Sequence, residues 1–158
     1  DWSAAINILE SQHNAFVVGR GYGFAVAQEA ALKLKETSGI HAEAFSSAEV
    51  LHGPLALIQG GFPVVLFTQN DDSLHDMIQL SRKMTSLGAK TMLAMSEGLA
   101  DLSSVTCSVQ LALPPSLHAV LDPLMNIQAF YLMLSSLSVL RGYDPDNPDH
   151  LNKVTQTR

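Results

Sequence analysis

Compact apolar runs alternate with longer amphipathic segments along this chain. The runs at residues 15–19, 63–68, 91–95 and 109–113 are short and rich in aliphatic side chains. Runs of this kind are typical of buried parallel strands, because helices cover both faces of such strands. The pattern therefore predicts four strands that lie inside the protein.

The first segment between these runs has the spacing of a helix. Between residues 24 and 38, Ala27, Ala30, Ala31 and Leu34 recur at intervals of three and four. Positions at these intervals share one face of a helix. Because three of the four side chains are methyl groups, the stripe predicts a helix packed closely on a sheet.

Two later segments also predict helices. Residues 71–73 read Asp-Asp-Ser, which suits the amino end of a helix, and Leu87-Gly88 suits its close. Residues 129–140 form an apolar run interrupted by serines, which predicts a buried helix. The longer apolar stretch at residues 121–140 could form an interface as easily as a core. No run approaches the ~18–20 apolar residues needed to cross a bilayer, so no membrane contact is expected.

The alternation of strands and helices predicts an α/β fold. Parallel strands joined by helices form a doubly wound, three-layer α/β/α sandwich with right-handed crossovers. The 158 residues fit a single domain, since domains commonly have ~100–150 residues. A turn-rich break at residues 142–148 precedes a polar tail that runs to residue 158.

Composition and charge narrow the classes of function. The net charge of −6 is spread along the chain, which argues against nucleic-acid binding because that needs clustered Lys and Arg. The single cysteine, Cys107, excludes an internal disulfide and a cysteine metal cluster, and together with the lack of a signal-peptide pattern it predicts a cytoplasmic protein. His13, His75, His118 and His150 have no pairing that suits a metal. We expect neither a metal nor a cofactor.

The turn after the first predicted strand is one candidate site. It reads Gly19-Arg20-Gly21-Tyr22-Gly23, and ligands of such folds bind where the carboxyl ends of strands meet. Glycines let the backbone approach a ligand closely, and the following helix end favours anions. However, the spacing differs from the dinucleotide fingerprint, and a tight turn without any ligand explains the same glycines.

A second candidate lies further along the predicted helix. Glu29, Lys33 and Glu36 share the helix face opposite the alanine stripe, where they can form a solvated ladder worth ~0.2–0.5 kcal/mol per pair. A role in chemistry is the alternative, but the spacing alone favours the ladder. His52, which precedes Gly53-Pro54, can titrate near neutrality or simply hold a loop carbonyl. Glu43 and Glu49 are expected to accept hydrogen bonds from backbone amides.

Several segments carry recognisable motifs in a fixed order. They are Gly19-Arg20-Gly21, residues 29–36, residues 40–45, residues 49–58, residues 142–148 and residues 151–153. Together they resemble the second sugar-isomerase (SIS) domain of the glucosamine-6-phosphate synthase family and related SIS-type deaminases. The resemblance implies a five-stranded parallel sheet between helices, a sugar-phosphate substrate, a preceding SIS domain in the same enzyme and a homodimer.

The resemblance also implies roles for single residues. Glu36 would move a proton between sugar carbons one and two, and Lys33 would assist the neighbouring hydroxyl or amine. His52 would open the sugar ring from the neighbouring subunit, and Lys153, in the tail at 142–158, would form an imine with the keto sugar. Four further positions would bind substrate: Gly19, Arg20, Gly21 and Glu29.

Two departures from the family pattern shape the expected function. The hydroxyl-rich phosphate loop of a first SIS domain is replaced by Thr-Gln-Asn-Asp-Asp-Ser at residues 68–73, whose carboxylates would repel phosphate. This chain would then form half of a site and leave the phosphate to the preceding domain. In the tail, Asp149 stands where the synthase has arginine, which favours a deaminase that releases ammonia from an amino sugar phosphate.

Three other functions remain open. The first is an isomerising aminotransferase, and the second is a non-catalytic sugar-phosphate sensor. A sensor would need no glutamate at position 36 and would usually accompany a basic DNA-binding segment, which this acidic chain lacks. The third is an inert dimerisation domain, in which Glu36→Gln would leave the activity of the complete enzyme intact.

Overall fold

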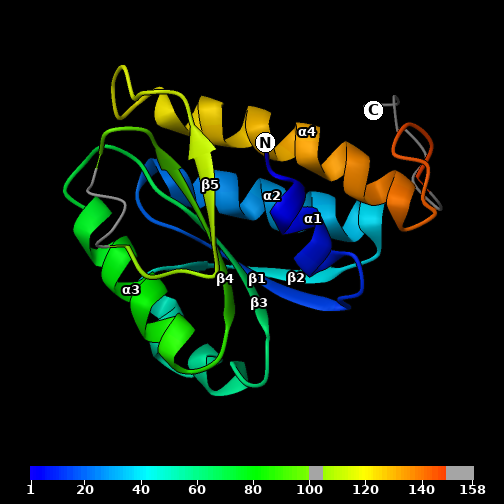
Figure 1. Cartoon of the computed structure of the whole chain (residues 1–158), viewed down its shortest axis with the longest axis horizontal. Coiled ribbons are helices and arrows are strands. Elements are labelled where there is room, and N and C mark those ends of the chain that lie inside the picture. Colours follow the sequence, from blue (N-terminus) through cyan, green and yellow to red (C-terminus); the bar gives the residue numbers. More distant parts are fainter. Residues whose placement is uncertain (100–104, 149–158) are drawn as a thin grey trace, which may run out of the picture.

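The computed structural model describes residues 1–99 and 105–148 as a five-stranded parallel sheet covered by helices (Figure 1). The strands are β1 (Asn14–Gly19), β2 (His41–Ser46), β3 (Pro63–Phe67), β4 (Lys90–Ser96) and β5 (Val109–Leu113). The helices are α1 (Ser3–Leu9), α2 (Tyr22–Ser38), α3 (Leu74–Ser86) and α4 (Asp122–Leu140), with short 3₁₀ turns η1 (Glu49–Leu51) and η2 (Pro54–Leu57). The predicted α/β sandwich is confirmed.

The sheet has the strand order β2-β1-β3-β4-β5, and all neighbours are parallel. The chain moves from β1 outward to β2, then returns to the other side of β1 as β3. Strand order therefore reverses between β1 and β3, and doubly wound folds bind ligands at the carboxyl ends of the strands on either side of such a reversal. The pattern missed β2 because it is an edge strand in which His41 and Glu43 are exposed.

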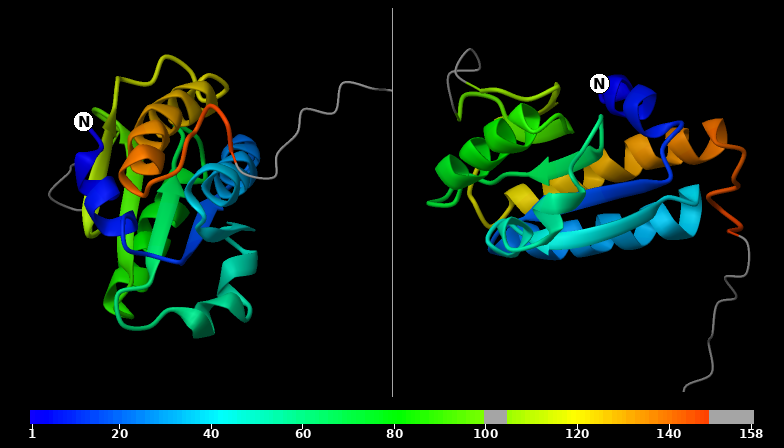
Figure 2. Two further views of the ribbon diagram at one scale, coloured as in Figure 1. Left: turned by 90° about the vertical axis from the view of Figure 1, so that its right-hand side faces the viewer. Right: turned by 90° about the horizontal axis from the view of Figure 1, so that it is seen from below.

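Two apolar cores lie on opposite faces of the sheet, because successive side chains of a strand point to opposite sides. Val17 and Val65 face α1, α2 and α4, whereas Phe16, Val18 and Leu66 face α3 and the 3₁₀ turns. Figure 2 shows the same arrangement from two further directions, with α2 and α4 on one side of the sheet and α3 on the other. The short helix α1 has no counterpart in the sequence prediction.

The alanine stripe of α2 lies at the centre of the first core. Ala27, Ala30, Ala31 and Leu34 are at most 2% exposed. Side chains this small let α2 approach both the sheet and α4. The helix begins at Tyr22, two residues before the predicted start, and ends at Ser38 as predicted. Gly39 follows in a left-handed conformation and returns its N–H to the carbonyl of Leu34.

Helix α4 has two different apolar faces. Phe130, Met133, Leu134 and Leu137 are buried in the first core. The opposite face exposes large apolar side chains: Leu124, Leu132 and Val139. The prediction of a buried helix is therefore right for one face only.

By length and composition, α4 is also apolar enough to cross a membrane, and it is the one such helix within residues 1–99 and 105–148. No segment of this character was predicted from the sequence, because serines interrupt the apolar run, but these serines do not make the helix polar. A core helix of a soluble protein passes the same test, and one face of α4 packs in the core. The finding is weak evidence for a membrane.

Candidate functional site

The charged face of α2 forms a compact ladder of three side chains. Lys33 Nζ lies 2.6 Å from Glu36 Oε2 and 3.9 Å from Glu29 Oε1. About a third of the Lys33 and Glu29 side chains is exposed, and somewhat less of Glu36. The expected shared helix face is therefore present, and its groups are open to a ligand. The predicted catalytic and binding roles of these residues stay predictions.

The ladder fixes the charge of Lys33. The hydrogen bond to Glu36 raises the pKa of the Lys33 ammonium, burial opposes this, and the charges of Glu36 and Glu29 reinforce it. Lys33 is therefore a cation at neutral pH. In this arrangement it can donate hydrogen bonds to Glu36 or to a substrate oxygen, but it is a poor base.

Helix α4 adds a residue to this ladder that the sequence analysis missed. Tyr131 donates a hydrogen bond from its hydroxyl to Glu29 Oε1 at 2.8 Å. Burial first, and then the hydrogen bond and the charge of Glu29, raise the pKa of Tyr131 to about 12. The two residues are 102 positions apart, so no local spacing could have indicated the contact.

Arg141, directly after α4, anchors the end of α2 that carries Glu36. Its Nε donates to the carbonyl of Ser38 at 2.6 Å. Its Nη1 donates to the carbonyl of Leu9 at 3.3 Å and to that of Glu10. Because these carbonyls close α1 and α2, one guanidinium satisfies two helix ends that would otherwise lack partners.

The start of the tail lies against the same helix end. The Ser38 and Ser138 hydroxyls are 3.0 Å apart, and the Tyr143 backbone N–H donates to the Ser138 carbonyl at 2.9 Å. The Tyr143 phenol fills the space that a side chain at Gly39 would need. The described part of the tail, up to residue 148, thus begins next to the turn of Glu36. Lys153 and Asp149 lie outside the described residues.

The glycine turn after β1 is filled by the protein itself. Gln69, which is 2% exposed, accepts a hydrogen bond from the Gly23 N–H at 2.8 Å. Gly21 has a φ of 53°, and a side chain at Gly19 would overlap the backbone of Gly23. The chain path therefore explains these glycines. The helix amide that was expected to meet an anion is taken by Gln69, while Arg20 remains exposed at the rim.

Asp71 holds the loop that carries Gln69. One carboxylate oxygen accepts the Gln69 amide, and the other accepts the Ser73 N–H at 2.9 Å and the Ser73 hydroxyl at 2.6 Å. Burial raises the pKa of Asp71, but the hydrogen bonds from Ser73 and Gln69 outweigh it and hold the pKa below its usual range. The helix start predicted from residues 71–73 is confirmed, because Ser73 is the N-cap of α3 and the helix begins at Leu74; no side-chain hydrogen bond caps it, and the Asp71 carboxylate serves this loop.

Asp122 and Asn126, at the start of α4, fix the other side of the same loop. Asp122 accepts the Asn70 N–H at 2.7 Å and the Ser116 hydroxyl at 2.6 Å. Asn126 donates to the carbonyl of Thr68 at 2.9 Å. Both residues are buried, and polar side chains within an apolar helix were the one available sequence signal for them.

His52 lies apart from the ladder. It is exposed between η1 and η2, which pack on the second core through Val50 and Ile58. Glu36 precedes the amino end of β2 in the opposite layer, whereas His52 follows its carboxyl end. A strand of six residues spans about 20 Å, so β2 separates the two groups.

The two remaining glutamates differ. The Glu49 carboxylate accepts a hydrogen bond from the Ser46 N–H, and the Glu49 N–H donates one to the Ser46 hydroxyl, both at 3.2 Å. This reciprocal pair is a capping box, and the hydrogen bonds of Ser46 lower the pKa of Glu49. Glu49 therefore bonds a backbone amide as expected. Glu43 is exposed on the edge strand β2.

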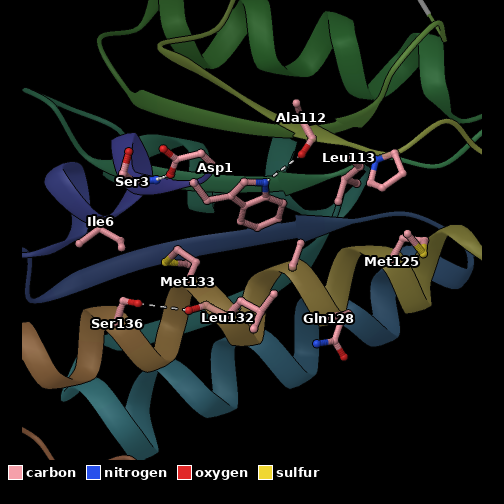
Figure 3. A pocket seen from close by; sticks show the side chains of 13 residues that line it. Asp1, Ser3, Ile6, Ala112, Leu113, Met125, Gln128, Leu132, Met133 and Ser136 are labelled. Carbon is pink, nitrogen blue, oxygen red and sulfur yellow. Dashed lines mark hydrogen bonds between the residues drawn. The ribbon is translucent and has the colours of Figure 1, made fainter.

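One groove is lined mainly by apolar residues, and none of the three ladder residues lines it. It measures about 570 Å³ between α1, the end of β5 and α4, where Leu113, Leu132 and Met133 line it (Figure 3). Trp2 closes its floor with a hydrogen bond from the indole to the Ala112 carbonyl at 3.1 Å. A smaller groove of about 350 Å³ lies beside Arg20 and Lys83. The groove in Figure 3 suits packing better than chemistry.

Comparisons with known proteins place the chain in a family. The SIS domain family matches residues 8–140. The isomerizing glutamine–fructose-6-phosphate aminotransferase of Chlorobaculum tepidum is 37% identical over 92% of this chain and 23% of its own length. That of Clostridium acetobutylicum is 38% identical over 87% of this chain and 22% of its own. The chain thus spans about a quarter of these relatives.

Solved structures agree with the fold. The C-terminal domain of a glucosamine-fructose-6-phosphate aminotransferase from Francisella tularensis superposes with a TM-score of 0.83 at 29% identity, over 91% of this chain and 40% of that one. A glucosamine-6-phosphate deaminase from Thermotoga maritima gives a TM-score of 0.67 at 24% identity, over 96% and 44%. The second likeness shows the shared fold alone.

Proposed function

This chain belongs to the SIS domain family, and from that premise we propose that it supplies the proton-transfer half of a phosphosugar isomerase site. The observation that carries the proposal is the contact between Lys33 and Glu36 on an accessible face of α2. The chain's relatives are isomerizing glutamine–fructose-6-phosphate aminotransferases. We therefore take the substrate to be a hexose phosphate that exchanges an amino group and a carbonyl.

Glu36 is the proposed base. Interconversion of an aldose and a ketose removes a proton from one sugar carbon and returns it to the adjacent carbon, while the double bond to the heteroatom shifts. A carboxylate beside both carbons can perform both transfers, and such positioned groups typically contribute ~10²–10⁴-fold. Lys33, held as a cation by Glu36, would donate a hydrogen bond to the oxygen or nitrogen on which charge develops.

The direction of amino transfer distinguishes two activities. The charge of Asp149 favoured a deaminase, but the deaminase structure is only 24% identical and supports the fold alone. The curated relatives at 37% and 38% identity are aminotransferases, and this supports isomerising amination better. We propose amination as the activity of the whole protein, with amine release as the second candidate.

The complete site requires other parts of the enzyme. Gln69 occupies the helix amide at which a phosphate would bind, which supports a phosphate site on a preceding SIS domain. The separation of His52 from Glu36 supports a site completed by a second copy in a homodimer. The chain's share of 22–23% of its relatives leaves room for these parts.

The test uses the complete native polypeptide. Ammonia-dependent and glutamine-dependent amination of fructose-6-phosphate is measured beside ammonia release from glucosamine-6-phosphate, for the wild type and Glu36→Gln. Glu43→Gln is the matched control, because it neutralises an exposed carboxylate on β2. We expect amination that Glu36→Gln abolishes and Glu43→Gln leaves intact.

Other outcomes have distinct meanings. Glu36-dependent ammonia release without amination would establish the deaminase instead. If neither reaction occurs but the sugar phosphates bind with equal affinity to wild type and variant, the protein is a sensor and the proposal is wrong. Reactions that proceed unchanged in Glu36→Gln would make the charged face of α2 inert.

A further inference from the structure

Helix α4 reaches the Glu29–Lys33–Glu36 ladder through one polar contact. The Tyr131 hydroxyl donates to Glu29 Oε1 at 2.8 Å, and this is the same oxygen that faces Lys33 Nζ at 3.9 Å. Lys33 instead makes its close contact, at 2.6 Å, with Glu36. The ladder is thus asymmetric, and Tyr131 lies on its weaker side.

Helix spacing alone does not produce this asymmetry. Lys33 follows Glu29 by four residues and precedes Glu36 by three, and both spacings bring an ammonium within reach of a carboxylate. The preferred pair on an isolated helix is the glutamate four residues before a lysine, which here is Glu29. The observed closer contact with Glu36 is the reverse of that preference, and the Tyr131 hydroxyl on Glu29 is a contact from outside α2 that acts in this direction.

We propose that Tyr131 is a positioning residue of the isomerase site, which occupies Glu29 and so leaves the Lys33 ammonium with Glu36. The hydroxyl takes a lone pair of the oxygen that would otherwise attract Lys33. Lys33 then orients the carboxylate that moves the substrate proton. This role rests on the proposed function of Glu36.

The surroundings of Tyr131 fit a polar role better than a packing role. Its side chain is 39% exposed, while its neighbour Phe130 is fully buried and forms the core contact with Phe67. The pKa of about 12 keeps the phenol protonated, and hence a donor, across the neutral range. Removal of the hydroxyl should therefore leave the fold intact.

The contact itself can be tested by titration. The ultraviolet difference between the complete wild-type polypeptide and Tyr131→Phe isolates the ionisation of this phenol. We expect the pKa of the Tyr131 phenol to be raised to about 12 in the wild type. In a Glu29→Gln background, the same difference should give a pKa shifted back toward 10.0. An unchanged midpoint in the two backgrounds would show that the phenol and Glu29 do not interact, which overturns the proposal.

Kinetics test the consequence. Tyr131→Phe should lower kcat about threefold to tenfold with little change in KM, as expected when an interaction made in the transition state weakens. Glu29→Gln removes the competing charge altogether, so Tyr131→Phe in that background should have almost no further effect. Ser135→Ala is the control, since it removes an exposed hydroxyl one turn further along α4 and should match the wild type.

The outcomes separate this proposal from the proposed function. If Glu36→Gln keeps full activity, both fail. If Glu36→Gln is inactive but Tyr131→Phe has the wild-type kcat, the positioning role alone is wrong. Effects of Tyr131→Phe and Glu29→Gln that simply add would also overturn it, because independent residues give additive effects.

Discussion

The two ends of α2 both carry polar groups, but these groups bond one another at the amino end and stay partly exposed at the carboxyl end. At the amino end, the Gly23 amide, Gln69 and Asp71 bond one another in a closed network. At the carboxyl end, about a third of the Glu29 and Lys33 side chains and somewhat less of the Glu36 side chain is exposed. The general rule for doubly wound folds favours the amino end as the ligand site. Here the exposed charged ladder lies at the other end, and that is where the proposed chemistry would occur.

The largest effect should follow a change at the open end. Glu36→Gln keeps the size of the side chain but removes the base, so we expect kcat of the complete enzyme to fall by ~10²–10⁴-fold. Thermal unfolding should change little, because the group is partly exposed. The rate of amination measured beside Glu43→Gln provides the check. Equal rates in the two variants would remove the distinction between the ends of α2.

A change at the closed end should affect folding instead. Gln69→Ala removes one of the two acceptors of the Gly23 N–H, the other being the Arg20 carbonyl at 2.9 Å, and the loss of a typical hydrogen bond costs ~0.5–1.5 kcal/mol. Urea unfolding measures this loss, with the exposed Gln79→Ala as control. Activity per folded molecule should stay near the wild-type value. A large loss of activity in a fully folded Gln69→Ala protein would place the amino end within the site after all.

Arg141, which anchors the carboxyl end of α2, should contribute to both stability and activity. Arg141→Gln removes donors from the closing carbonyls of α1 and α2, so we expect ~1–2 kcal/mol less stability. A fall in kcat should accompany this loss, since Glu36 lies in the anchored turn. Lys35→Gln is the control, because it removes an exposed cation from the same last turn of α2. If Arg141→Gln unfolds more easily but reacts as fast as Lys35→Gln, the anchor does not position Glu36.

The smallest effect concerns alkaline pH. The pKa values of Tyr131, at about 12, and of Lys33 are both raised in the folded chain. The folded state then holds more protons than the unfolded state above the ordinary pKa of tyrosine, 10.0. The stabilisation is complete below that pH and is lost as the pH rises through the folded values. The urea concentration at the unfolding midpoint should fall less steeply with rising pH in Tyr131→Phe than in the wild type. Identical slopes would contradict the contact between Tyr131 and Glu29.

Local patterns accounted for much of the fold and for part of the site. The four apolar runs became β1, β3, β4 and β5, and the alanine stripe became the buried face of α2. The edge strand β2 was missed because it is covered on one side and lacks an apolar run. The start of α3 follows directly after residues 71–73, as predicted, although the carboxylate of Asp71 bonds the loop and does not cap the helix.

The sequence by itself determined that Glu29, Lys33 and Glu36 share a helix face, because the geometry of a helix fixes which neighbours three and four residues apart meet. It also contained the ordered motifs by which the SIS family is identified. Only the tertiary structure decided which carboxylate holds Lys33, and which end of α2 stays open. Those outcomes depend on Tyr131, Arg141 and Gln69, whose partners lie between 46 and 132 positions away in the chain. Contacts across such distances are set by how the layers pack, and no local spacing encodes them.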